Sequence, residues 1–292
     1  MQESWKYSTI PTSKIREYGL YTDFIYKYVE QRKDAEAKQT KWGCLEKLFG
    51  KKIQNINDSK NSLPNPIEHP CGETMHFFTF YTNSADLDCV ITRNTDKKRY
   101  TIIFCGSESF LDWFYDLFVC KVSLPDGSKV HDGFHKQLTS NNSFDDMKNL
   151  IERYIFDEPK WDWYVTGHSS GGALSTLSAY LLSDEFSSVK WTVISLGSPR
   201  VGNKLFSDRF NNRENLRHFR LCNGRDIVTS LPYFGYYHCG YNLRYIDRKW
   251  ISFGICQEVD GLFPKLKYSL FYFYSPCDHL CDRYITHLGI AQ

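Results

Sequence analysis

Hydrophobic and polar positions follow a helical pattern near the start of this chain. Residues 12–40 carry apolar and aromatic side chains at helical spacing, and the charged residues 30–34 lead out to solvent. This pattern predicts a helix that packs one face against the rest of the protein. Residues 50–70 are rich in Lys, Asn, Ser and Pro, a composition typical of a loop or an insertion.

From residue 86 onward, strand-like runs alternate with helical patterns. Residues 86–93 and 99–105 are β-like and are separated by a polar turn, which predicts a hairpin. The other strand-like runs are 163–166, 191–196, 216–222 and 241–246, and the helical patterns are 144–156, 173–186 and 280–288. This alternation predicts an α/β fold, with a central, mostly parallel sheet and helices on both faces. We expect a single domain over residues 1–292, with 1–75 as an N-terminal helix and loop extension.

A tight turn joins a predicted strand to a predicted helix within residues 164–174. It carries the pattern G-x-S-x-G, formed by Gly167, Ser169 and Gly171. A serine at such a corner has a cramped backbone and points out of the sheet, which requires small neighbours. The pattern predicts Ser169 as a catalytic nucleophile, and a plain strand-to-helix turn is the alternative.

A nucleophilic serine needs a base, which is best a histidine oriented by a buried carboxylate. In serine hydrolases with α/β sheets, the acid follows the serine in the chain and the histidine comes last. Asp226 is the best acid because it follows a predicted strand, and functional groups lie at the carboxyl ends of parallel strands. Asp208 falls within a predicted helix, and Asp247 comes late in the chain.

Three histidines downstream of the serine are candidates for the base. His279 lies in a polar loop that can lift its imidazole over the edge of the sheet, and we select it. His238 precedes a strand-like run that it can brace. His287 lies about two turns into a helical pattern, where a packing or surface role is expected.

The tetrahedral intermediate of acyl transfer needs hydrogen-bond donors for its oxyanion. We expect these donors at the backbone N–H of Ser170, next to the nucleophile, and at Ser107, after an early strand. Residues 110–118 then show an amphipathic helical pattern, which on its own indicates either core packing or a mobile cover over a pocket. Its apolar side chains include Phe110, Leu111, Trp113 and Phe114.

The composition of the chain argues against some classes of function. The chain has 292 residues, of which 41% are hydrophobic and 24% charged, as in an ordinary soluble globular protein. A net charge of +2 offers no case for nucleic-acid binding. No apolar run reaches the ~18 residues of a transmembrane helix, and the first residues lack a secretory pattern, so we expect no transmembrane segment and favour the cytoplasm.

Ten cysteines raise the question of disulfides or metal. Cys105, Cys120 and Cys222 lie within or just after apolar segments, where buried thiols are usual, so we expect reduced cysteines. The cluster at 277–281 lacks a second Cys or His pair at zinc spacing. We therefore expect no metal.

Several motifs occur in a fixed order along the chain. They are Phe-Cys-Gly-Ser at 104–107 with Asp-Trp at 112–113, Lys-Val-His-Asp-Gly-Phe at 129–134, Gly-His-Ser-Ser-Gly-Gly at 167–172, Gly-Ser-Pro-Arg-Val-Gly at 197–202, Asn-Gly-Arg-Asp-Ile-Val at 223–228, and Asp-His-Leu at 278–280. Together they resemble the motifs of the class 3, or fungal-type, lipase family of the α/β-hydrolase superfamily. The resemblance runs from about residue 79 to the C-terminus, although the segment after the histidine is longer than the family's H-x-x-Y-F arrangement.

The resemblance implies a serine hydrolase that acts on lipid esters without metal or cofactor. It implies Ser169 as nucleophile, Asp226 as acid, His279 as base and Ser107 in the oxyanion hole. It also favours residues 110–118 as a lid that meets a membrane or droplet surface.

We therefore expect a triacylglycerol-type lipase that works by two-step acyl transfer. A phospholipase A1, a small-ester esterase and a non-catalytic lipase-like binding protein are the alternatives. Residues 262–264 and 270–274 are apolar and aromatic, and we expect a core strand there, with membrane association as the alternative.

Overall fold

The computed structural model describes residues 5–49, 77–82, 85, 87–106, 120–252, 254 and 276–289. The predicted loop at 50–70, the predicted lid at 110–118 and the aromatic segments 262–264 and 270–274 lie outside these residues.

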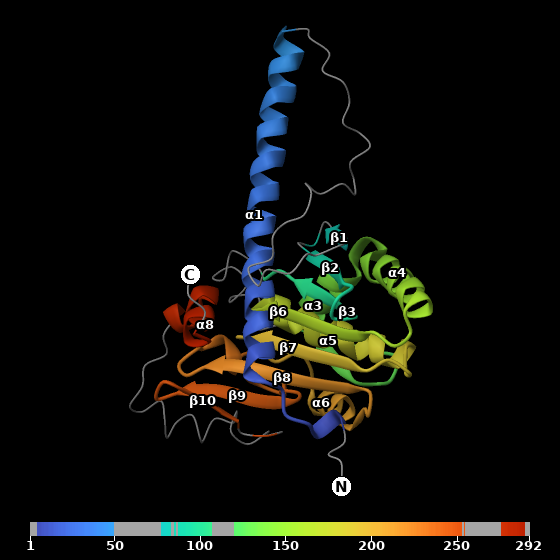
Figure 1. Cartoon of the computed structure of the whole chain (residues 1–292), viewed down its shortest axis with the longest axis vertical. Helices are drawn as coiled ribbons and strands as arrows, with labels where there is room; N and C mark the ends of the chain where they lie inside the picture. Colours follow the sequence, from blue (N-terminus) through green and yellow to red (C-terminus); the bar gives the residue numbers. More distant parts are fainter. Residues whose placement is uncertain are drawn as a thin grey trace.

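An eight-stranded sheet runs through the described part of the chain, in the order β1-β2-β3-β6-β7-β8-β9-β10 (Figure 1). Its strands are β1 Phe77–Thr82, β2 Asp88–Asn94, β3 Arg99–Phe104, β6 Asp162–His168, β7 Trp191–Leu196, β8 Leu216–Asn223, β9 Tyr241–Ile246 and β10 Lys249–Ser252. Strands β3, β6, β7, β8 and β9 pair in parallel, whereas β1, β2 and β10 add antiparallel edges. The expected mostly parallel sheet is confirmed, and the predicted hairpin is β2–β3.

The remaining elements surround this sheet. A small ribbon pairs β4 Lys121–Ser123 with β5 Lys129–His131, and the α-helices are α1 Thr12–Phe49, α3 Asp132–Thr139, α4 Ser143–Asp157, α5 Ser170–Glu185, α6 Lys204–Asn212 and α8 Cys281–His287. Short 3-10 helices are η1 Trp5–Tyr7, η2 Ser140–Asn142, η3 Val228–Ser230 and η4 Pro276–His279. The helices predicted near 12–40, 144–156, 173–186 and 280–288 correspond to α1, α4, α5 and α8.

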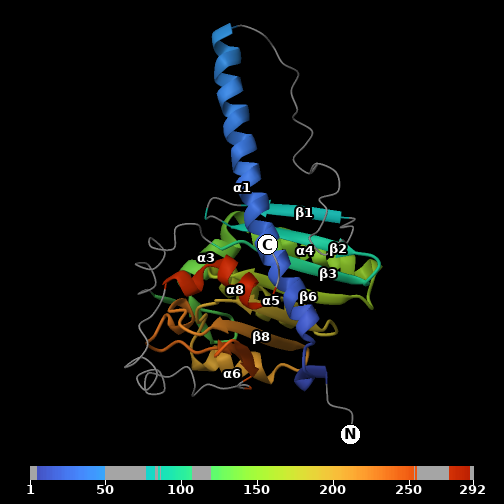
Figure 2. The ribbon, with the colours of Figure 1, turned by 60° about the vertical axis from the view of Figure 1, so that its left-hand side comes forward.

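The sheet has a hydrophobic core on each face, because successive strand residues point to opposite sides. Ile102 of β3 and Val165 of β6 pack on the side of α5. Their neighbours Ile103 and Tyr164 pack on the other side, against α1 and α8. Figure 2 shows α1 crossing this second face beside α8. Helices therefore cover both faces, as predicted.

Polar contacts fix the start of α1 to the sheet. The carboxylate of Glu17 accepts hydrogen bonds from Arg99 Nη1 over 3.0 Å and from Lys97 Nζ over 3.2 Å. Before the helix, the Trp5 carbonyl accepts from Arg217 Nη1 over 2.7 Å. The first part of the chain thus packs on the sheet, while the extent of one domain over 1–292 stays a prediction.

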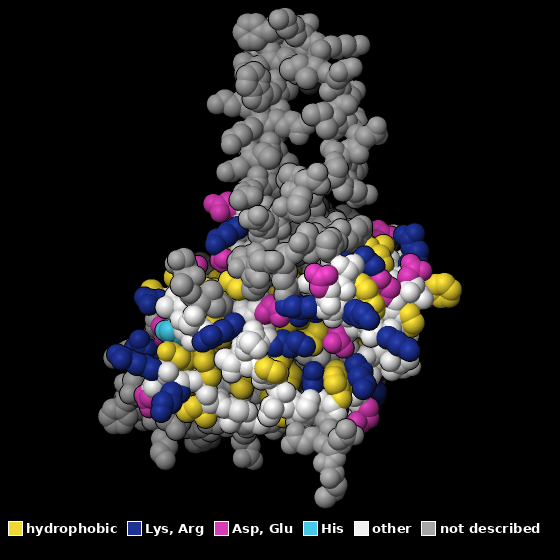
Figure 3. All heavy atoms as spheres, in the orientation of Figure 1, with side chains coloured by type: hydrophobic (Ala, Val, Ile, Leu, Met, Phe, Trp, Pro, Cys, Tyr) yellow, Lys and Arg dark blue, Asp and Glu magenta, His cyan; other side chains and the backbone are white. Residues whose placement is uncertain are grey.

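The described surface carries mixed charge. On the face drawn in Figure 3, acidic and hydrophobic side chains lie between the Lys and Arg side chains. None of the helices in the described ranges combines the length and the apolar character that crossing a membrane requires.

Among the cysteines with described positions, Cys105 and Cys222 are buried as expected. The expectation of a buried thiol was wrong for Cys120, which is exposed. Cys120 directly precedes the ribbon strand β4, whose residues Lys121 and Val122 are only half-buried, so it lies next to a strand at the surface and not in the core.

Candidate active site

Ser169 lies at the corner between β6 and α5. Its backbone has φ 58° and ψ −130°, a conformation that residues other than glycine rarely adopt. The corner is held in place because Ser169 N–H donates to the Leu196 carbonyl over 3.0 Å and the Ser169 carbonyl accepts from Gly172 N–H over 2.9 Å. The elbow predicted from G-x-S-x-G is therefore present.

The glycines of the elbow allow the backbone segments to touch. A Cβ on Gly171 would lie 2.4 Å from the Phe104 carbonyl oxygen, and one on Gly167 would lie 2.5 Å from the backbone of Gly171. Both distances are too short for real side-chain atoms, so α5 can start directly against the ends of β3 and β6 only with glycine at these positions.

Three buried side chains form a continuous hydrogen-bonded chain. His279 Nε2 lies 2.8 Å from Ser169 Oγ, and His279 Nδ1 lies 2.9 Å from Asp226 Oδ2. Their exposed fractions are 5%, 5% and 2% for Ser169, His279 and Asp226. Asp226 follows β8 and His279 is the last residue of η4, so the structure brings the predicted nucleophile, acid and base together at one edge of the sheet. This is the geometry in which a histidine removes a serine proton while a carboxylate orients it.

Tyr284 is a member of this site that the sequence did not indicate. Its hydroxyl donates to Asp226 Oδ2 over 2.6 Å and accepts from Asn223 N–H over 2.9 Å. Burial raises the pKa of the Tyr284 phenol well above its usual value, so the hydroxyl keeps its proton and stays a donor. The other carboxylate oxygen, Asp226 Oδ1, accepts from Val228 N–H over 2.8 Å. Asp226 is thus fixed on both oxygens.

Gly197, directly after β7, leaves the space that Asp226 and His279 occupy. It has φ +59°, and a Cβ there would lie 2.9 Å from Asp226 Oδ2 and 3.1 Å from His279 Nδ1. Glycine is needed for the backbone conformation and for the space alike. This explains the first glycine of the Gly-Ser-Pro-Arg-Val-Gly motif.

Asn223, the last residue of β8, holds the segment that carries His279. Its side-chain amide donates to the Asp278 carbonyl over 2.9 Å, and its Oδ1 lies 3.0 Å from His287 Nδ1. His287 in turn stacks on Tyr245 with ring centroids 4.1 Å apart. His287 therefore has the packing role that its helical position predicted.

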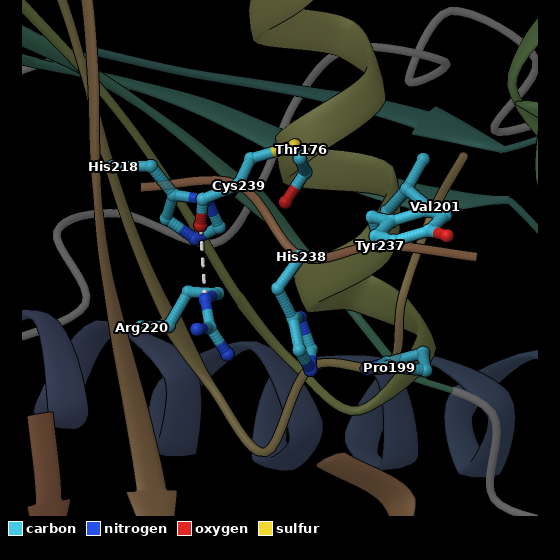
Figure 4. A pocket seen from close by; sticks show the side chains of 8 residues that line it. All are labelled: Thr176, Pro199, Val201, His218, Arg220, Tyr237, His238 and Cys239. Atoms are coloured by element: carbon cyan, nitrogen blue, oxygen red, sulfur yellow. Dashed lines mark hydrogen bonds between the residues drawn. The ribbon is translucent and has the colours of Figure 1, made fainter. Parts of the chain in front are cut away.

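The remaining acid and base candidates lie elsewhere. His238 lines a small crevice with seven other residues, shown in Figure 4, and its Nε2 bonds the Thr229 carbonyl over 2.7 Å. Arg220 and Cys239 in the same crevice are joined by a hydrogen bond of 2.9 Å from Nε to the carbonyl. Asp208 is half-buried on α6 and pairs with Lys204. These side chains are engaged in structural contacts.

Ser170 is fully buried and is the first residue of α5, where backbone N–H groups lie at the positive end of the helix dipole. Ser107 and the predicted lid residues Phe110, Leu111, Trp113 and Phe114 lie outside the described residues. Gly106, the residue before Ser107, lies beside Ser169, since a Cβ on Gly106 would lie 3.3 Å from Ser169 Cβ.

Within the described ranges, no group of three or more His, Cys, Asp or Glu side chains is arranged to hold a metal ion. In the Cys277–Cys281 cluster, His279 directs its two ring nitrogens at Asp226 and Ser169.

The match to a known family covers the elbow and the acid. Residues 101–236 match the family described as Lipase (class 3). Residues 101–236 belong to the class 3 lipase family of the α/β-hydrolase superfamily. His279, the predicted base, lies outside the matched residues, and its assignment depends on the geometry given above.

Two curated relatives of different types show similar identity. The lipase of Rhizomucor miehei is 32% identical over 185 residues, which cover 60% of this chain and 47% of that protein. The chloroplastic phospholipase A(1) DAD1 of Arabidopsis thaliana is 32% identical over 155 residues, 47% of this chain and 34% of that protein. The chain thus spans less than half of the length of these two relatives.

A solved structure shares the fold. It is a triacylglycerol lipase whose catalytic centre is described as a serine protease triad, with TM-score 0.60 and 29% identity, covering 69% of this chain and 78% of that one. This chain therefore has the α/β-hydrolase fold that its motifs implied.

Proposed function

We propose that this protein is a serine hydrolase that cleaves carboxylic ester bonds of lipids. The observation that carries the proposal is the buried chain of hydrogen bonds from Asp226 through His279 to Ser169. Membership of residues 101–236 in the class 3 lipase family supports lipid esters as the substrate class.

In the first half of the reaction, Ser169 Oγ attacks the ester carbonyl carbon while His279 Nε2 takes the hydroxyl proton. Asp226 stabilises the imidazolium that forms. The oxyanion of the tetrahedral intermediate accepts from the Ser170 N–H and, in the proposal, from Ser107. As the intermediate collapses, His279 returns the proton to the leaving alcohol, and an acyl group remains on Ser169.

In the second half, His279 takes a proton from water, whose oxygen attacks the acyl carbonyl. A second tetrahedral intermediate forms at the same donors and releases the fatty acid as Ser169 regains its proton from His279. The site then returns to its starting state.

Hydrolysis of p-nitrophenyl butyrate by the wild type and by Ser169→Ala tests this proposal. We expect the variant to lose about 10⁴-fold or more in turnover. A fluorophosphonate probe should label the wild type at Ser169, identified by peptide mapping. Ser178→Ala, a buried serine of the same helix, is the matched control and should keep full activity and labelling. Equal rates for the wild type and Ser169→Ala would overturn the proposal.

Within lipid esters, we propose a triacylglycerol-type lipase that acts at a membrane or droplet surface. The Rhizomucor miehei relative and the triacylglycerol lipase structure support this choice. Activity on a triglyceride emulsion should exceed activity on phospholipid vesicles, and the rate should jump when substrate passes its solubility limit. A steady saturation curve without a jump would contradict action at a surface.

A phospholipase A1 is the second candidate, because the Arabidopsis phospholipase reaches the same 32% identity as the fungal lipase. Phosphatidylcholine vesicles with distinguishable acyl chains at the two glycerol positions decide between the candidates. Release of the acyl chain from the sn-1 position at a rate above that of triglyceride hydrolysis would assign phospholipase A1 activity to this protein.

The proposed lid comprises residues 110–118 and the proposed oxyanion donor is Ser107. Ser107→Ala should lower turnover by about 10²- to 10³-fold, the usual loss for one oxyanion donor. Phe110→Ser combined with Phe114→Ser should lower emulsion activity while leaving hydrolysis of dissolved p-nitrophenyl butyrate within about twofold, since an apolar lid face acts only where lipid is aggregated.

A further inference from the structure

Helix α1 reaches the candidate active site through Tyr26. Its phenolic oxygen lies 3.0 Å from Nδ1 of His168, and the two rings meet edge to face with centroids 5.8 Å apart. Nε2 of the same imidazole lies 2.6 Å from the backbone carbonyl oxygen of His279. His168, the second residue of the elbow motif, thus connects α1 with the residue that carries the proposed base.

The chemistry of these groups fixes the direction of both hydrogen bonds. A carbonyl oxygen only accepts, so His168 Nε2 must carry a hydrogen. Burial, together with the neighbouring His279, lowers the pKa of His168 to about 3, so the imidazole is neutral and has a single N–H. His168 Nδ1 is therefore an acceptor, and the Tyr26 hydroxyl is its donor. Tyr26 stabilises the tautomer of His168 that can bond to the His279 carbonyl.

His279 contacts His168 through both its backbone and its ring. Besides the carbonyl contact, the two imidazoles stack with centroids 4.7 Å apart and planes 30° apart. His279 ends the short helix η4, which is only 4 residues long. A helix of that length holds its last residue weakly by itself, so outside contacts set where the His279 ring lies relative to Ser169.

Tyr26 has little freedom to move away from this arrangement. A Cβ on Gly106 would lie 2.2 Å from the Tyr26 hydroxyl, so this hydroxyl fills the space beside the backbone that leads to Ser107. The helix around it is anchored by Phe24 and Ile25, which are buried against the sheet. The hydroxyl is thus held by the fold at the place where His168 needs a donor.

We infer that Tyr26 is a positioning residue for the proposed base His279 and that it acts through the tautomer and orientation of His168. The inference rests on the proposed function, because that function makes His279 the base. It assigns a role in the reaction to α1, which precedes the residues 101–236 matched by the family.

The first test is Tyr26→Phe, which removes one oxygen atom and keeps the ring. With p-nitrophenyl butyrate, kcat should fall about tenfold, because a base displaced by a fraction of an ångström transfers the proton less efficiently. KM should stay within about twofold, since no substrate contact is lost. Tyr18→Phe is the matched control: Tyr18 lies earlier on α1 and its ring stacks on Tyr164, so its kcat should equal that of the wild type.

The second test is His168→Gln, which offers an amide N–H near the position of Nε2 without needing a tautomer. If Tyr26 acts through His168, Tyr26→Phe should change kcat by less than about twofold in the His168→Gln background, although it costs about tenfold in the wild type. Losses that multiply in the double variant would overturn the inference.

A third readout does not depend on turnover. The proton between His279 Nδ1 and Asp226 should give a low-field ¹H NMR resonance that is absent in Asp226→Ala. Tyr26→Phe should shift this resonance, and Tyr18→Phe should leave it in place. An unshifted resonance in Tyr26→Phe, or equal kcat for Tyr26→Phe and Tyr18→Phe, would overturn the inference.

A failure of the proposed function can be distinguished from a failure of the Tyr26 inference. In that case the wild type neither hydrolyses esters nor reacts with the fluorophosphonate probe, while the NMR comparison still decides whether Tyr26 positions His279.

Discussion

Tyr284 donates a hydrogen bond to Asp226, with 2.6 Å between the phenolic oxygen and Oδ2. The same oxygen of Asp226 faces Nδ1 of His279, so one carboxylate oxygen holds both the tyrosine and the base. The second donor fixes the orientation of the carboxylate, so Asp226 is better directed at the imidazole than a carboxylate held by one donor would be.

Tyr284→Phe should therefore lower kcat of ester hydrolysis by about tenfold, the factor that corresponds to about 1.4 kcal/mol of a charge-assisted hydrogen bond. It should also lower the free energy of unfolding by about 1–3 kcal/mol, because Asn223 N–H loses its acceptor. Steady-state kinetics and urea unfolding measure the two effects.

Tyr180→Phe provides the control for this change. Tyr180 also donates to a carboxylate, that of Asp126, but it lies on α5 away from the triad. The Tyr180→Phe variant should be less stable than the wild type and have the same kcat. If both variants lost activity equally, Tyr284 would have no special relation to Asp226.

Gly197→Ala should lower kcat by about 10²-fold, because the new methyl group would collide with Asp226 Oδ2 and His279 Nδ1 and displace them. The positive φ adds about 1 kcal/mol of backbone strain. Gly127→Ala separates the two effects: Gly127 has φ +82° and no atom within 4 Å of an added Cβ. Gly127→Ala should lower the melting temperature through this strain and leave kcat unchanged. If Gly127→Ala and Gly197→Ala both lost activity, the steric explanation would be refuted.

Ser169→Gly should abolish activity and raise the free energy of unfolding by about 1 kcal/mol, since glycine adopts φ 58°, ψ −130° without the cost a side chain brings. Thermal or urea unfolding of the two proteins gives the difference. Ser178→Gly, in the middle of α5, should instead destabilise by about 1 kcal/mol. A Ser169→Gly variant less stable than the wild type would mean that the elbow is unstrained.

Stability should decrease in mild acid because of His168. Its pKa falls from the usual 6.5 to about 3 in the folded protein, owing to burial and then to the neighbouring His279, with Asp226 acting in the opposite sense. Between these values the unfolded chain binds a proton that the folded protein does not, so the stabilisation is complete above about pH 6.5 and is lost as the pH falls toward 3. At pH 4.5 the loss should be roughly 2–3 kcal/mol.

Urea unfolding at pH 7 and pH 4.5 measures this loss, and His168→Gln should reduce the difference between the two pH values. His218, whose pKa burial also lowers, acts in the same direction and should leave a remainder in the variant. An unchanged pH dependence in His168→Gln would contradict the neutral, buried state of His168.

The sheet and most of its helices could be predicted because local periodicity determines which side chains each element buries. Ile102 and Ile103 lie next to each other in β3 and face opposite cores, as a period of two requires. The order Ser169, Asp226, His279 could also be predicted, since Ser169 and Asp226 each follow a strand and the histidine comes last in serine hydrolases with α/β sheets. Their catalytic roles stay predictions until they are tested.

Other parts of the site depend on contacts between distant segments and left no local signal. Tyr26 belongs to a helical stripe of aromatic residues and looks like an ordinary packing residue until Gly106 and His168 are placed beside it. Tyr284 comes five positions after His279, whereas the family pattern H-x-x-Y would put a tyrosine at the position of Asp282. Only the turn from η4 into α8 brings its hydroxyl to Asp226.

The proposed triad comes from positions 169, 226 and 279 of the chain. Helix α1, which begins at residue 12, contacts this site through Tyr26 and His168. A ribosome releases these positions in order, and non-local contacts form only after the later ones have emerged. A chain that ends before residue 279 contains Ser169 and Asp226 but lacks the proposed base. The proposed lipolytic activity therefore requires a chain that has been synthesised at least as far as residue 279.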